Sequence, residues 1–356
     1  MDLLLLPLPY RNAALVVLGV WAWYLNLRGL ESANIDVASM LKIQTGKLSR
    51  RVLGTAVALT AVLTCSIGLF WIQVKSWTGQ EHELPSTASS LDVLPFLTLI
   101  LILVLLLFPG RSPGHHRFWV VFSRIALGRI DVSARLGDIL LADGLISYAR
   151  VLGDIGVVFC ELKGKQTLLG LPDRTCGSLT FIPLLTVIPS LIRLRQCFIE
   201  LKLTGNQTHL YNFIKYGTSL PAAAFAVLHR AGWNCFGLWV LAQMINSGYS
   251  LYWDVTKDWG LSLNLPDGRL RKNANLHFPK AFYRVAIVVD VILRFAFLLK
   301  LSSTYSYLTE VEGGMFVFTF LELFRRWIWV FFRVENEWSN QPQEIRLKSL
   351  PVTEPN

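Results

Sequence analysis

Apolar residues in this 356-residue chain gather into blocks of about twenty, and are not spread at helical spacing along amphipathic segments. One helical crossing of a bilayer requires roughly 20 apolar residues. The blocks at 52–74 and 91–108 reach this length without a lysine or arginine. Windows of this length predict nine spans, near 12–28, 52–74, 91–109, 138–160, 177–193, 211–229, 233–253, 282–301 and 314–333. The pattern therefore predicts an all-α fold, a polytopic transmembrane helical bundle of about nine spans.

The charged residues indicate how these spans are oriented. Only 16% of the residues are charged, and the cations behind the formal net charge of +10 lie mainly in short loops. Because cytosolic loops are enriched in lysine and arginine, the basic loops are expected in the cytosol: 28–51, 109–135, 193–215 and 254–284. The cation-free segment 302–313 is then lumenal or extracellular. If successive spans cross the membrane in alternating directions, the N-terminus lies outside and the tail lies in the cytosol. This arrangement departs from the positive-inside rule only at the basic residues Lys163, Lys165 and Arg174. Topology thus accounts for the basic balance, and no nucleic-acid partner is expected.

Two further features concern membrane contact and cysteine chemistry. The stretch 115–130 is aromatic and basic but too short for a span, which predicts a helix lying in the membrane interface, with His115 and His116 facing lipid headgroups. The cysteines show no CxxC or Cys/His spacing, and most lie in or beside apolar segments: Cys65, Cys160, Cys176, Cys197 and Cys235. Free buried thiols are expected, with no metal site and no cofactor.

Several charged residues fall inside the predicted spans, where each must face a polar cavity or a partner. In the fourth span a polar stripe recurs at i, i+4, i+7 and i+11, which is one face of a helix: Asp143, Ser147, Arg150 and Asp154. The eighth span holds Asp290 and Arg294 at i, i+4. The ninth holds Glu322, with Arg325 and Arg326 three and four residues later. Such spacings allow local ion pairs.

Local pairing leaves positive charge over in the last two spans, because three arginines face two carboxylates. Guanidinium forks match tetrahedral oxyanions in a bidentate manner, which favours phosphate or sulfate over chloride as the missing anion. Ion pairs that join helices, or arginines that snorkel to the interface, are the alternative, above all for Arg326 and Arg333. More polar groups flank the spans and could serve either as site residues or as helix-end anchors: Arg193, Arg195, Lys215, Tyr216, Asp254 and Asp258.

Six segments, in order, resemble the EXS-domain family of eukaryotic phosphate exporters, over residues 28 to 338. LADGLISYARVLGD (141–154) is similar to the family's LADQLTS-type helix, IRLRQC (192–197) to its RxxQC segment, and IKYGTS (214–219) to its Lys-Tyr element. YSLYWDVTKDWGL (249–261) resembles YxxxWDxxxDWGL, and DVILRFAF (290–297) resembles DVILRFxW. LELFRRWIWVFFRVENEW (321–338) resembles ExFRRxxWNFFRxENEH.

The resemblance implies a phosphate site, carried over motif by motif onto residues already singled out: Asp143, Arg193, Lys215, Tyr216, Asp254, Arg294, Glu322, Arg325 and Arg326. Two positions depart from the family pattern. Ile146 stands where a polar residue is common, and Phe297, a possible hydrophobic gate, stands where tryptophan is common. The gate therefore need not work as it does in the family, and a packing role for Phe297 is the alternative.

Exporters of this family carry an N-terminal SPX sensor domain, whereas this sequence is similar to the short fungal branch without one, the ER-retention-defective protein of the Golgi. That branch implies return of inorganic phosphate from the Golgi lumen to the cytosol, and a link to glycosyltransferase recycling and retention of lumenal ER proteins. The expected organisation is N-terminal segments at 1–135, an EXS-type core with the anion path at 136–338, and a cytosolic tail at 339–356 that could bind sorting machinery.

Two other classes of function compete with transport. A non-transporting scaffold for glycosyltransferase sorting and ER retention would have no need of arginines at membrane depth. A membrane-embedded transferase would need a nucleophile with a histidine partner, or metal-ligand spacing, and the spans show neither. The sequence therefore favours a transporter over an enzyme.

Overall fold

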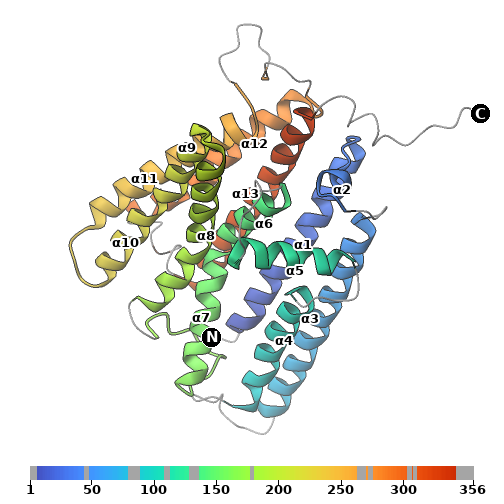
Figure 1. The fold of residues 1–356 in the computed structure, drawn as a ribbon. Helices are drawn as coiled ribbons and strands as arrows, with labels where there is room; N and C mark the ends of the chain where they lie inside the picture. Colours follow the sequence, from blue (N-terminus) through green and yellow to red (C-terminus); the bar gives the residue numbers. More distant parts are fainter. Residues whose placement is uncertain are drawn as a thin grey trace, which may run out of the picture.

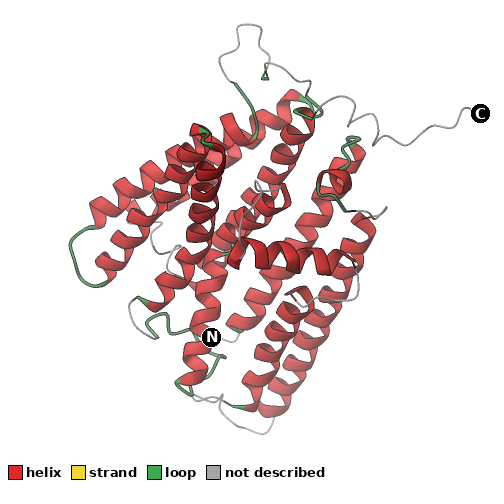
Figure 2. Cartoon of the chain, in the orientation of Figure 1, coloured by secondary structure: helices red, strands yellow, loops and turns green. Residues whose placement is uncertain are grey.

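A computed structural model describes residues 6–43, 48–78, 89–107, 113–127, 136–176, 180–262, 270–271, 276–302, 307 and 311–341. Helices joined by loops make up this part of the chain (Figure 2), which confirms the all-α prediction. The helices are α1 (Leu8–Ser32), α2 (Val37–Met40), α3 (Leu48–Thr78), α4 (Ser90–Leu107), α5 (Pro113–Leu127), α6 (Leu136–Ser147), α7 (Ala149–Lys163), α8 (Phe181–Thr204), α9 (Gln207–Gly217), α10 (Ser219–Arg230), α11 (Phe236–Trp253), α12 (Lys280–Arg294) and α13 (Glu312–Ser339). A π-helix, η2 (Asp254–Asp258), continues α11, and a 3-10 helix, η3 (Ala296–Leu301), follows α12.

Among the described residues, four helices are long and apolar enough to cross a membrane, namely α1, α3, α4 and α8. Together with the helical fold, they agree with a polytopic bundle. The count of nine spans stays a prediction, because the other five expected spans are not among these four helices. Figure 1 shows α1, α3 and α4 side by side, with α13 lying between them and the group formed by α8 to α12. Helix α1 contacts α3, α4 and α13 and so joins the two groups.

The core of the N-terminal group forms where α1, α3 and α4 meet. Tyr10, Leu59, Phe70 and Ile102 are all almost fully buried there. The Tyr10 hydroxyl and the Ser66 Oγ lie 2.8 Å apart, so the polar end of this buried ring has a partner. Burial of their apolar faces holds these three helices against one another.

Three expected spans are broken, and each break lies at membrane depth in the predicted topology. The fourth span divides into α6 and α7 at Tyr148, and the sixth into α9 and α10 at Thr218. The eighth changes from α-helix to 3-10 helix after Arg294. Interrupted helices are tolerated within a bilayer where the backbone lines a cavity or is buried in protein. The breaks therefore point to a polar interior between these helices.

The α6–α7 break is held against α1 by one tyrosine. The Tyr148 hydroxyl donates a hydrogen bond of 3.1 Å to the Leu15 carbonyl. Gly19 makes this approach possible, since a Cβ at that position would lie 1.8 Å from the Tyr148 oxygen. The junction between α6 and α7 is thus held to α1 by a contact that depends on the absence of a side chain at Gly19.

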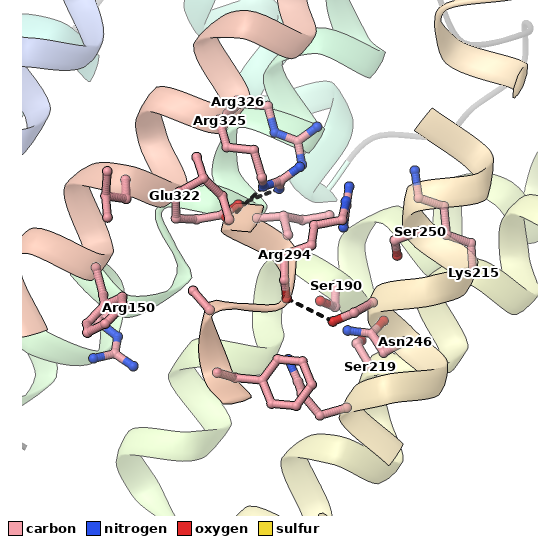
Figure 3. Close-up of a pocket in the computed structure, with 18 of the residues that line it drawn as sticks. Arg150, Ser190, Lys215, Ser219, Asn246, Ser250, Arg294, Glu322, Arg325 and Arg326 are labelled. Carbon is pink, nitrogen blue, oxygen red and sulfur yellow. Dashed lines mark hydrogen bonds and ion pairs between the residues drawn. The ribbon is translucent and has the colours of Figure 1, made fainter. Parts of the chain in front are cut away.

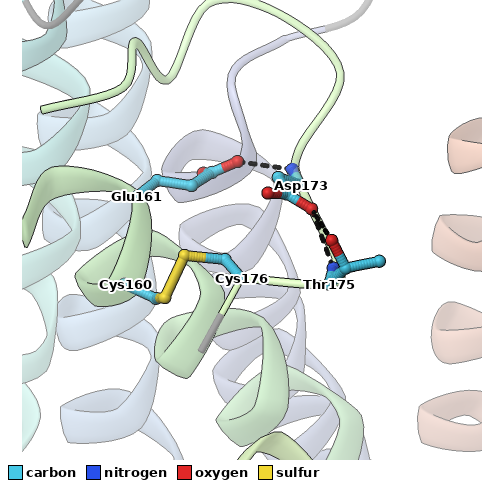
Figure 4. Close-up of a disulfide and its surroundings, with 5 residues drawn as sticks. All are labelled: Cys160, Glu161, Asp173, Thr175 and Cys176. Carbon is cyan, nitrogen blue, oxygen red and sulfur yellow. Dashed lines mark hydrogen bonds between the residues drawn. A yellow bond between two sulfur atoms is a disulfide. The ribbon is translucent and has the colours of Figure 1, made fainter. Parts of the chain in front are cut away.

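The prediction of free cysteines is wrong for two of the five. Cys160, at the end of α7, and Cys176, in the following loop, form a disulfide with a Cα–Cα distance of 5.9 Å (Figure 4). The loop folds back over the end of α7, and this brings together two thiols that no short motif connects. Cys65, Cys197 and Cys235 are free, and of these Cys65 is exposed and the other two are buried.

The predicted interfacial segment is helical over 115–127, the part of it that the structure describes. Helix α5 runs across the neighbouring helices, not along them (Figure 1). Its Arg124 forms an ion pair with Asp138 at the start of α6. A location in the membrane interface stays a prediction, and the side chains of His115 and His116 lie outside the described residues.

A candidate anion site lined by basic side chains

A cavity of about 380 Å³ lies among the broken helices. Pockets of roughly 300–1,000 Å³ are the usual size for small ligands. Every interrupted element contributes to its wall: Lys215 and Ser219 flank the α9–α10 break, Arg294 ends α12, and Phe297 lies in η3. Figure 3 shows Arg294 between the Arg325–Arg326 pair of α13 and the polar side chains of α8 to α11. The cavity thus occupies the position that the breaks indicate.

The charge of the cavity wall is strongly positive. Among the described residues that line it there is a single carboxylate, Glu322, against six cations: Arg150, Lys215, Arg294, Lys300, Arg325 and Arg326. Desolvated cations at this density repel one another unless carboxylates or a bound anion lie between them.

Asp254 is the main counterion behind the wall. Its side chain is fully buried, and one oxygen accepts from the Lys215 ammonium at 3.0 Å. The other oxygen pairs with Arg294 and lies 3.5 Å from Nη1 of Arg325. One carboxylate at the start of the π-helix therefore fixes cations from α9, α12 and α13. π-Helical turns often occur at such functional positions.

The π-helix that carries Asp254 is itself anchored to α13. The Asn336 amide donates to the Asp258 carbonyl at 3.0 Å, and the Trp329 ring nitrogen donates to the Asp258 carboxylate at 3.2 Å. Further along, the buried Glu335 carboxylate accepts from Arg271 at 2.9 Å and from the Tyr283 hydroxyl. These bonds tie the loop after α11 to α13 and so hold Asp254 in place.

Arg325 is paired along α13 and across to α12. Its guanidinium donates to Glu322 at 2.6 and 2.9 Å and to Asp290 at 3.1 Å. Arg294 also binds Asp290, at 3.2 Å. The expected pairs Asp290–Arg294 and Glu322–Arg325 are thus present, whereas Arg326 makes no ion pair with Glu322 among the described residues. The contacts to Asp254 join them into one network that sequence spacing did not reveal.

A second buried group supports the cavity from α6 and α8. Nε of Arg193 lies 2.9 Å from the Asp143 carboxylate, and its Nη2 donates to the Tyr216 hydroxyl at 3.1 Å. That hydroxyl donates to Asp143 at 2.6 Å. Asp143 and Arg193 do not line the cavity, whereas Tyr216 does. The pair therefore orients Tyr216 from behind the wall.

Arg326 differs from its neighbour because it has no carboxylate partner among the described residues. It donates to the Ser147 hydroxyl at 3.0 Å, and its guanidinium carbon lies 4.6 Å from the centre of the Trp329 ring. Ser147 in turn donates to Glu322 at 2.9 Å. Arg326 is therefore a cation in the cavity wall without an ion-pair contact among the described residues, in agreement with the surplus counted from the sequence.

The structure brings all nine sequence-predicted site residues into one region. Six line the cavity, namely Lys215, Tyr216, Arg294, Glu322, Arg325 and Arg326, and the other three, Asp143, Arg193 and Asp254, lie directly behind them. Phe297 lines the cavity too and packs edge-on against Trp239, with ring centres 6.0 Å apart. Its position agrees with either a gate or a packing role. Binding of phosphate by these residues remains a prediction.

Sequence reasoning missed several uncharged and basic residues of the wall. Gln243, Ser247 and Ser250 recur at i, i+4 and i+7 along α11, and Asn246 lies between them. This is the spacing of one helix face, so a search for polar residues at helical spacing would have found them. Lys300 lies at the end of the expected span 282–301, and only the structure places it in the cavity wall.

The chemistry available to this site is binding. Guanidinium, ammonium, hydroxyl and amide groups donate hydrogen bonds into the cavity, as oxyanion recognition requires. Across the described residues, no group of three or more histidine, cysteine or acidic side chains is placed to hold a metal ion.

Comparison with known proteins agrees with the motifs. The EXS family model matches residues 6–339. The human protein named solute carrier family 53 member 1 is 34% identical over 232 residues, which are 59% of this chain and 33% of that protein. Protein ERD1 homolog 1 of Schizosaccharomyces pombe is 26% identical over 373 residues, with 98% of this chain and 96% of that protein covered. ERD1 homolog 2 of the same yeast is 24% identical over 380 residues, with 93% and 96% covered. The chain is thus a helical membrane protein that belongs to the EXS family.

Proposed function

We propose that this protein carries inorganic phosphate across a Golgi membrane, from the lumen to the cytosol. The observation that carries the proposal is the cavity wall, with six cations against one carboxylate, at the break points of helices in a relative of a solute carrier. The six cations of the wall outnumber the carboxylates that pair with them, which are Glu322, Asp254 and Asp290. An anion would offset the excess, and the planar forks of guanidinium groups suit a tetrahedral oxyanion.

The same geometry supplies both binding and release. Arg294, Arg325 and Arg326 offer donors from two helices, and Lys215 adds a point charge from α9. Asp254 and Glu322 hold these cations in position and compete with phosphate for their donors. A conducting site must bind its ion firmly enough to strip its water yet weakly enough to let it leave. Shared carboxylates meet that requirement, since each one offsets part of the attraction.

The disulfide supports the sidedness of the proposal. Disulfides persist in oxidising compartments, so Cys160 and Cys176 belong on the lumenal side. The loop alternation predicted from basic residues also puts 161–176 on that side. With this end lumenal, the N-terminus is lumenal and the tail after α13 is cytosolic. The likeness to the yeast ERD1 homologs along nearly the whole chain supports placement in the secretory pathway.

Phosphate return would link transport to glycosylation, because it removes a product that glycosyl transfer leaves in the lumen. Recycling of glycosyltransferases and retention of lumenal ER proteins are proposed to follow from that flux, with sorting machinery as a possible contact of the cytosolic tail.

Flux of labelled phosphate in proteoliposomes tests the proposal. Purified wild type is compared with Arg294→Ala and Arg325→Ala, and with Arg230→Ala as a control at an exposed arginine outside the cavity. Loss of a charge-assisted hydrogen bond costs about 1.5–3 kcal/mol, so each cavity variant should lose roughly tenfold or more of the flux while the control keeps it. Equal flux in all four proteins would reject the transport mechanism. If Arg294→Ala lost flux while glycosyltransferases kept their location in cells, the sorting role would not depend on transport.

A further inference from the structure

Arg150 is a basic residue of the cavity wall that the central carboxylates do not contact. It lies in the first turn of α7, its side chain is exposed, and it lines the cavity. Within the described part of the chain, its guanidinium makes no hydrogen bond or ion pair. An arginine that faces an embedded cavity without a counterion is costly unless water or an anion satisfies its donors.

The acidic groups nearest to Arg150 are already bound by other arginines. Asp154 and Glu312 interact electrostatically with Arg150. However, Arg174 binds Asp154 at 2.7 Å and Glu312 at 2.5 and 2.9 Å. Arg11 of α1 also donates to Glu312, at 2.7 Å. The carboxylates are thus shared with two other guanidinium groups, and Arg150 is left to a ligand.

Arg150 also lies apart from the central arginines. Figure 3 shows it and Lys215 on opposite sides of Arg294. From Arg150, α7 runs on to Cys160, where the disulfide closes the loop that carries Arg174. Lys300 lines the cavity in η3, six residues beyond Arg294. The cavity wall therefore has basic side chains at its centre and, at Arg150, on the side from which α7 leads to the disulfide.

We infer that Arg150 forms a second oxyanion position in the cavity, on the disulfide side of the Arg294–Arg325–Arg326 cluster. This inference rests on the proposed function and adds a step to it: an anion from the lumen meets Arg150 first and then passes to the central cluster. Two positions in series let an anion leave one site as it enters the next, so neither needs to bind loosely by itself.

Protection from phenylglyoxal, which modifies accessible guanidinium groups, tests the second position on the unmutated protein. Purified protein in detergent is treated with the reagent in inorganic phosphate or in chloride of equal ionic strength, and modification of each arginine is measured by mass spectrometry. Arg230, exposed at the end of α10 and outside the cavity, is the internal control. Phosphate should slow modification of Arg150 at least threefold and leave Arg230 unchanged.

An Arg326→Gln protein separates the two positions. Protection of Arg150 should persist in this variant, because its ligand does not depend on the central cluster. If protection is lost there, one central anion explains it and the second position is rejected. Protection of Arg326 but not of Arg150 in the unmutated protein rejects the inference and leaves the proposed function standing. If phosphate protects no arginine of the cavity, both the second position and the proposed function are rejected. If Arg150 is never modified, its accessible position in the cavity is contradicted.

Discussion

Asp254→Asn tests whether a buried carboxylate holds the cations of the site while a surface carboxylate does not. Asp254 is fully buried and contacts three cations. At the 3.0 Å separation from Lys215, the attraction is roughly 5 kcal/mol with an effective dielectric of about 20. Desolvation of both groups offsets much of it. Removing one partner of a buried pair costs about 3–5 kcal/mol, because the remaining charges stay uncompensated.

The variant should therefore be destabilised by about 3–5 kcal/mol in phosphate-free buffer. Phosphate should restore part of this loss, since its negative charge replaces that of the missing carboxylate. A ligand at 100 times its Kd adds about 2.7 kcal/mol of stability, and tighter binding in the variant makes the gain exceed that of wild type at equal phosphate. Flux should fall, since phosphate held by an uncompensated cluster leaves slowly.

Thermal unfolding in detergent, measured across a phosphate titration, gives both quantities. Glu337→Gln is the matched control, because that carboxylate is 43% exposed and pairs with Arg333 at 2.8 Å. A surface pair of this kind contributes about 0–1 kcal/mol. If Asp254→Asn melted like the control, the carboxylate would not hold the site. If phosphate raised its melting temperature no more than that of wild type, phosphate would not occupy the place assigned to it.

Two further predictions concern the scaffold around the site. Cys160→Ser removes a disulfide with a sequence separation of 16, and the loop-closure model predicts that the free energy of unfolding falls by about 3 kcal/mol. Unfolding curves should show this loss. A reducing agent should lower the stability of wild type but not of the variant. Gly19→Ala places a methyl group against the Tyr148 hydroxyl, which must withdraw from its backbone partner, at a cost of about 1–3 kcal/mol. Gly68→Ala is its control, since nothing lies within 4 Å of a Cβ there. Equal melting temperatures of the two glycine variants would contradict the close packing of α1 against the α6–α7 junction.

How far sequence reasoning reached is clearest at the charged residues. Arg294, Arg325 and Glu322 were identified because a charge among apolar residues must have a partner, and this rule holds for any fold. The pairs at i, i+3 and i, i+4 followed from helix geometry alone. Asp143 and Lys215 were also singled out from the pattern of polar residues, and the family motifs assigned them to a phosphate site. The shared counterion that Arg294, Arg325 and Lys215 contact in the folded protein could not be inferred in the same way.

The tertiary structure decided which groups meet. Asp254 binds cations from α9, α12 and α13, and no spacing along the chain connects these elements. The disulfide of Cys160 with Cys176 depends on a loop that folds back, and the junction of α6 and α7 at Tyr148 is held by a hydrogen bond to α1. Local pattern determines which segments are apolar and which residues are out of place there, because hydrophobic transfer and helix periodicity act over a few turns. Long-range packing decides where helices break and which charges share a counterion, because those energies arise only once distant segments touch.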